Sequence, residues 1–126
     1  MLSLIQCADV VVDQLVLGWY AMFAIEGMAF GKPVVCHIRP QYRDLYIGAG
    51  LVGAAELPFV DSSIFTIKET LRGLASLTRR ELKDIGLRSR SFVERHHSLE
   101  AIGLTFDGIN RQLGLQRSLE IKRENK

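Results

Sequence analysis

Two short runs of apolar residues stand out in the first third of the chain, and neither alternates with polar residues. The first covers residues 10–12, and the second begins at residue 34, directly after a Gly-Lys-Pro sequence at 31–33. Runs of this kind predict parallel strands that are covered on both faces. Residues 23–30 between them read as a helix that the Gly-Lys-Pro sequence ends. The pattern therefore predicts a strand–helix–strand unit.

Helical spacing of apolar residues dominates the rest of the chain. The elements predicted after the second strand are a short helix over 44–49, a third strand over 57–60, and helices over 64–74, 78–96 and 98–113. Pro58 favours an edge position for the third strand, because proline cannot donate to a ladder. Thr78 with Glu81 forms a capping box, and Ser98 is a suitable cap for the last helix.

The order of these elements predicts an α/β fold with a parallel sheet, flanking helices and a helical carboxyl-terminal part. We expect one domain over residues 1–115. The polar residues 116–126 are expected to fray. Residues 1–6 read as the end of a helix whose beginning is absent.

The composition of the chain argues against several classes of protein but does not indicate a particular function. The chain has 126 residues, 48% of them hydrophobic and 24% charged, with a formal net charge of +2. No basic stripe with interleaved aromatic residues is present, so binding to a nucleic-acid polymer is not expected. No apolar stretch reaches the ~20 residues of a transmembrane helix, and residues 1–6 lack the basic region of a signal peptide. A cytoplasmic location is expected.

The residue types of metal and nucleophile chemistry are sparse. Cys7 and Cys36 lie next to or inside predicted strands, where small buried apolar residues are expected. His96 and His97 are adjacent at a helix end, a spacing that does not suit a shared metal ion. No motif of a nucleophilic hydrolase or zinc enzyme occurs. The sequence therefore predicts no metal site.

Ligands of open α/β sheets bind beyond the carboxyl ends of the strands, which here means the loop 14–21 and the helix that follows. Glu26 lies in that helix, and its two carboxylate oxygens match the two hydroxyls of a ribose. The alternative is a solvated helix glutamate. The loop Gly18, Trp19, Tyr20 and Ala21 leads to a helix start that can hold phosphate, or it is a tight turn with packed aromatic rings.

Arg39 lies just after the second strand, on the same presumed ligand side. Its guanidinium could pair with a phosphate bidentately. The alternative is a surface arginine beside the turn at Pro40.

Residues 8–35 resemble the nucleotide-sugar-binding half of group 1 glycosyltransferases with the GT-B fold. In that family a strand similar to ADVFV leads through E-G-F-G to a helix ending in E-A-x-A-x-G-x-P-V-V. Here the corresponding helix reads FAIEGMAFGKPVV without a gap. Glu26 fits the second of the family's two glutamates, whereas the first falls on Gly18, so that carboxylate is missing. A weaker resemblance continues to about Leu113.

The resemblance implies a Rossmann-like sheet, part of a GT-B carboxyl-terminal domain, and transfer of a sugar from a nucleoside diphosphate sugar to an acceptor. Glu26 would hold the ribose, Gly18 to Ala21 the diphosphate and sugar, and Arg39 a phosphate. No metal or other cofactor is implied. The partner would be an amino-terminal domain or another subunit, and the chain alone would be inactive. The alternatives are a truncated, inactive nucleotide-binding or subunit-docking protein, and a nucleotide-sugar epimerase on the same scaffold.

Overall fold

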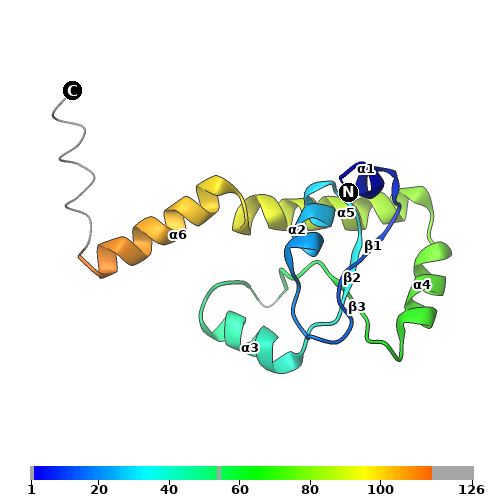
Figure 1. The fold of residues 1–126 in the computed structure, drawn as a ribbon, viewed down its shortest axis with the longest axis horizontal. Coiled ribbons are helices and arrows are strands. Elements are labelled where there is room, and N and C mark those ends of the chain that lie inside the picture. The colour runs from blue at the N-terminus through cyan, green and yellow to red at the C-terminus, as the bar shows by residue number, and fades with distance from the viewer. Residues whose placement is uncertain (1, 54, 115–126) are drawn as a thin grey trace. The chain divides into compact units, whose positions relative to one another are not determined.

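The computed structural model describes residues 2–53 and 55–114 (Figure 1). Strands and helices alternate along the first part of the chain, and helices alone follow. The elements are α1 (Leu2–Cys7), β1 (Val11–Val12), α2 (Met22–Ala29), β2 (Val34–Cys36), α3 (Pro40–Gly48), β3 (Val60–Asp61), α4 (Ile67–Ala75), α5 (Arg79–His96) and α6 (Leu99–Gln112). The tail predicted to fray over 116–126 lies outside the described residues.

The three strands form one parallel sheet in the order β1-β2-β3. Val11 pairs with Val34, and Val35 pairs with Val60. The predicted α/β fold is thus confirmed, and the parallel β/α arrangement is that of a Rossmann-like sheet. The third strand is shorter and later than predicted, at Val60–Asp61 instead of 57–60.

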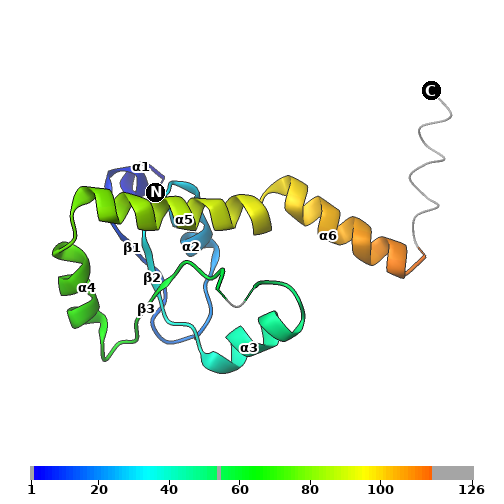
Figure 2. The same cartoon turned by 180° about the vertical axis from the view of Figure 1, so that it is seen from behind.

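One face of the sheet carries the main core. Val11, Val34 and Cys36 are buried there with Met28 of α2 and Phe92 of α5. The strands lie between α2 on one side and α4 on the other (Figures 1 and 2). Because side chains alternate along a strand, the residue after Val11 faces away from α2.

Val12 is that next residue, and 38% of it is exposed. The prediction that the first strand is covered on both faces is therefore wrong at this position. The reason is its place in the sheet: β1 is an edge strand, and no further strand of the described residues lies beyond it.

Helix α5 approaches the turn between α2 and β2 very closely. A Cβ atom built on Gly86 would lie 1.8 Å from the carbonyl oxygen of Gly31. Gly31 itself has a φ of +67°, which favours glycine. The two glycines together allow the backbone of α5 to rest on this turn.

The helix starts agree with the sequence where a side-chain cap is present. Thr78 N–H donates to Glu81 Oε2 at 2.7 Å, and Glu81 N–H donates to Thr78 Oγ1 at 3.3 Å, so the predicted capping box is confirmed. Ser98 Oγ accepts from Ala101 N–H at 3.1 Å, as predicted. Helix α3 instead begins at Pro40, earlier than the predicted 44–49, because proline suits a first helical position.

Compact packing divides the chain into two units, residues 1–94 and 95–126. In the second unit, four apolar residues at helical spacing along α6 and its C-cap are exposed; they are Ile102, Phe106, Ile109 and Leu113. In the first unit, Cys36 is buried as predicted, but Cys7 is exposed. Helix α1 has six residues and only Ile5 reaches the core.

Within the described residues, no helix combines the length and hydropathy needed to cross a membrane.

Candidate functional site

The carboxyl ends of the three strands bring Asp13, His37 and Asp61 to one edge of the sheet. Asp13 N–H donates to the Val35 carbonyl at 2.9 Å, directly after β1. His37 N–H donates to the Gln14 carbonyl at 3.0 Å, which ties the loop after β1 to the end of β2. The loop predicted to border a ligand site is therefore anchored at this edge.

Loop 14–21 is closed by hydrogen bonds at both ends. Gln14 Nε2 donates to the Trp19 carbonyl at 2.7 Å, and Ala21 N–H donates to Asp13 Oδ2 at 3.0 Å. Arg39 N–H donates to the Gly18 carbonyl at 2.8 Å. The structure thus brings the predicted site residues Gly18, Ala21 and Arg39 into one loop cluster.

Gly18 and Arg39 are in direct contact. Gly18 is buried and has a φ of +87°. A Cβ atom built there would lie 2.2 Å from Arg39 Cγ and 2.8 Å from Arg39 Nε. The guanidinium also donates from Nη2 to the Val16 carbonyl at 3.2 Å. The space in which a side chain at position 18 would begin is therefore filled by the arginine.

Trp19 and Tyr20 pack into an aromatic cluster. The ring centroid of Trp19 lies 4.1 Å from that of Tyr46, and the centroid of Tyr20 lies 4.7 Å from that of Phe59. Burial, with a smaller effect of Tyr46, raises the pKa of Tyr20 to about 12. These contacts support the packing interpretation of both rings, so a ligand at this turn would meet mainly backbone.

The start of α2 lacks a side-chain cap at its N-cap residue, Ala21. Within the described residues, the N–H groups of residues 22–24 have no hydrogen-bond acceptor. Such groups carry the positive end of the helix dipole and favour an anion. The Asp13 carboxylate, which accepts from Ala21 N–H, is a negative charge already close to that end.

Glu26 lies about one turn after the first residue of α2, Met22, or about 6 Å from it along the helix axis. Its side chain is half-buried and makes no hydrogen bond or ion pair with any residue in 2–53 or 55–114. The carboxylate oxygens are therefore available to donors from outside. The neighbouring Gly27 lies against Val11, which holds this part of the helix on β1.

Asp61 has a role that the sequence did not predict. Its Oδ1 accepts from Ile38 N–H at 3.1 Å and lies 3.4 Å from His37 Nδ1. A pocket of about 120 Å³ lies beside it and is lined by Ile38, Arg43, Ala55, Leu57, Phe59 and Asp61. A polar residue at a strand end is the signal that could have identified this position.

Negative charge at the strand ends affects the buried thiol of Cys36. The pKa of this thiol is raised to about 12. Burial is the largest cause, and the negative charges of Asp13 and Asp61 add to it, whereas a hydrogen bond from the Gln14 backbone lowers the pKa in part. The thiol is therefore inert as a nucleophile. Among the described residues, no three His, Cys, Asp or Glu side chains are grouped in a way that could hold a metal ion.

Comparisons of the chain with protein-family models, with curated proteins and with solved structures found no match.

Proposed function

We propose that this chain binds a nucleoside diphosphate sugar at the carboxyl edge of its sheet, as the donor-binding part of a GT-B-like glycosyltransferase. The observation that carries the proposal is the pairing of two features on α2. The helix starts with uncapped N–H groups at the strand ends, and Glu26 presents an unpaired carboxylate one turn later.

Each feature would serve a different group of one ligand. The ribose hydroxyls donate to the two oxygens of Glu26, and the diphosphate lies at the helix start beside the backbone of loop 18–21. Arg39 adds a guanidinium that stays next to Gly18 and carries positive charge for the phosphates. The transferred sugar then lies beyond the loop, facing an acceptor bound by an amino-terminal domain or another subunit.

The chemistry assigned to this chain is electrostatic. The helix start and the Arg39 guanidinium stabilise the negative charge of a leaving diphosphate, and no residue of the chain is assigned as a nucleophile or a general base. The acceptor and its base belong to the partner, so this chain by itself binds the donor without transferring the sugar.

A second candidate is nucleotide binding without transfer. It is favoured by the contact between Gly18 and Arg39, which leaves no carboxylate where the resembling family has its first glutamate. The two candidates share the nucleotide site and differ in the sugar. Analysis of products from a labelled donor, with the partner supplied, separates sugar transfer from epimerisation and from binding alone.

The test of the nucleotide site is a calorimetric titration of uridine, adenosine and guanosine diphosphates into the parental protein and Glu26→Ala. Loss of charge-assisted hydrogen bonds should cost about 1.5–3 kcal/mol, or roughly 10- to 100-fold in Kd. Glu69→Ala is the matched control, because Glu69 is an exposed glutamate in the first turn of α4. Equal affinities for the parental protein and Glu26→Ala would refute the assignment.

A further inference from the structure

A second pocket lies at the opposite, amino-terminal edge of the sheet. It has a volume of about 230 Å³ and is lined by Asp9, Gly31, Lys32, Pro33, Arg79, Leu82 and Lys83. Asp9 precedes β1, and Gly31 to Pro33 precede β2, so the pocket is separate from the strand ends that form the proposed donor site. All of its residues belong to the first compact unit.

The lining of this pocket is strongly cationic. Three positive side chains and one negative side chain face it, a net formal charge of +2. Lys32 Nζ is positioned by donating to the Gln6 carbonyl at 2.8 Å, and an ammonium group has two further donors. Arg79 and Lys83 make no ion pair with any residue in 2–53 or 55–114.

Arg79 and Lys83 place two like charges at the start of α5. They are four residues apart on α5, where like charges repel, and they lie in its first turns, where the helix dipole is already positive. Glu81 of the same turn is not among the residues that line the pocket, and its carboxylate oxygen Oε2 accepts hydrogen bonds from Thr78 N–H and Thr78 Oγ1 at 2.7 Å each. An anion in the pocket would relieve both effects.

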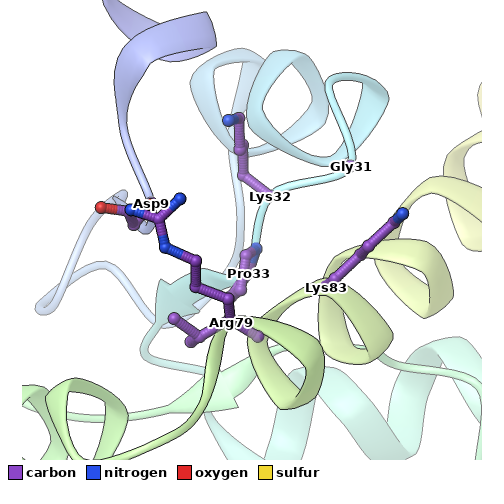
Figure 3. A pocket seen from close by; sticks show the side chains of 7 residues that line it. Asp9, Gly31, Lys32, Pro33, Arg79 and Lys83 are labelled. Atoms are coloured by element: carbon purple, nitrogen blue, oxygen red, sulfur yellow. The ribbon is translucent and has the colours of Figure 1, made fainter.

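The size and shape of the pocket limit the anion. Its volume is below the ~300–1,000 Å³ of typical small-molecule sites but is several times the ~30 Å³ of one water. Figure 3 shows that the cations diverge: Arg79 extends towards Asp9, whereas Lys83 extends to the other side, near Gly31. Because these two cations point apart, two linked anionic groups suit the pocket better than one compact anion.

We propose that this pocket, between the Gly31–Pro33 turn and the first turns of α5, binds a ligand with two linked phosphate groups. Lys32 and Arg79 hold one phosphate and Lys83 holds the other, while Pro33 and Leu82 form the apolar floor. The same chemistry occurs in a free diphosphate compound and in adjacent headgroups of an anionic lipid surface.

The test uses the full chain, labelled with ¹⁵N, and sodium pyrophosphate as the probe. Saturable amide shifts are expected at residues 31, 32 and 79–83. Arg79→Gln with Lys83→Gln should weaken binding by about 2- to 5-fold per charge removed, or roughly tenfold together. Arg80→Gln with Arg88→Gln is the matched control: it removes the same charge from exposed positions of α5 that do not line the pocket.

Vesicles of phosphatidylglycerol and of phosphatidylcholine distinguish the two sources of phosphate. Binding to phosphatidylglycerol that depends on Arg79 and Lys83 supports the lipid source, and binding of pyrophosphate alone supports a free compound. The proposal is overturned if neither probe binds, or if both double variants weaken binding equally. Shifts confined to residues 18–24 would also overturn it, while supporting the donor site at the other edge.

Discussion

Gly86→Ala tests the close approach of α5 to the turn after α2. The new Cβ atom would lie 1.8 Å from the Gly31 carbonyl oxygen, 2.7 Å from the Gly31 carbonyl carbon and 3.4 Å from Lys32 N. These are backbone atoms, so no side-chain rotation relieves the overlap. Overpacking of this kind costs about 1–3 kcal/mol or more. Alanine gains about 1 kcal/mol over glycine in a helix. Because the overlap is with backbone atoms, a cost of about 2–3 kcal/mol is expected here, which leaves a net loss of about 1–2 kcal/mol.

The assay is equilibrium unfolding in urea, followed by circular dichroism. With a slope of about 2 kcal/mol per molar urea, the midpoint should fall by roughly 0.5–1 M. Gly73→Ala is the control, because it lies in α4 and a Cβ atom there meets nothing within 4 Å. It should raise the free energy of unfolding by about 0.5–1 kcal/mol. If Gly86→Ala is as stable as the parental protein or more stable, the packing of α5 on this turn is refuted.

Three further changes test other parts of the structure. Gly18→Ala should cost at least about 1–2 kcal/mol, because φ is +87° there and the new methyl group displaces the arginine stem; an unchanged urea midpoint would contradict this. Thr78→Ala should cost about 1 kcal/mol through loss of the cap. It also removes the side-chain hydrogen bond that does most to lower the pKa of Glu81, while the bond from the backbone N–H of residue 78 remains. The stability that is present above about pH 4.3, and is lost as pH falls through the lowered pKa, should therefore become smaller in a pH series of melts, and an unchanged pH dependence would contradict this. A thiol reagent should label Cys7 in the native protein and Cys36 only on unfolding, and equal rates would contradict their burial.

The order of elements could be predicted from the sequence because each signal is local. The β-branched run at 10–12 and the Gly-Lys-Pro sequence at 31–33 predict the first two strands whatever surrounds them. The ends of the elements are harder to predict than their order. Helix α3 begins at Pro40, whereas the sequence predicts a start at residue 44, and β3 begins after Pro58, whereas the predicted strand includes it.

The candidate site depends on contacts between distant residues, which sequence spacing does not reveal. Nothing near Gly18 indicates that Arg39 fills the space above it, although a glycine between bulky loop residues is a hint of positive φ. The hydrogen bond from Ala21 N–H to Asp13 joins the end of a strand to the start of a helix eight residues later. The exposure of Cys7 is also set by tertiary packing, since Ile5 is the residue of α1 that is buried. The resemblance to glycosyltransferases stays a prediction.

The claim that a diphosphate binds at the start of α2 is tested most directly by Asp13→Asn. Asparagine keeps an acceptor for Ala21 N–H and removes the negative charge beside the proposed diphosphate position. Calorimetric titration with uridine diphosphate should give tighter binding by about 1 kcal/mol or more, roughly 5-fold in Kd, opposite in sign to Glu26→Ala. An unchanged or weaker affinity of Asp13→Asn would contradict a diphosphate at this helix start.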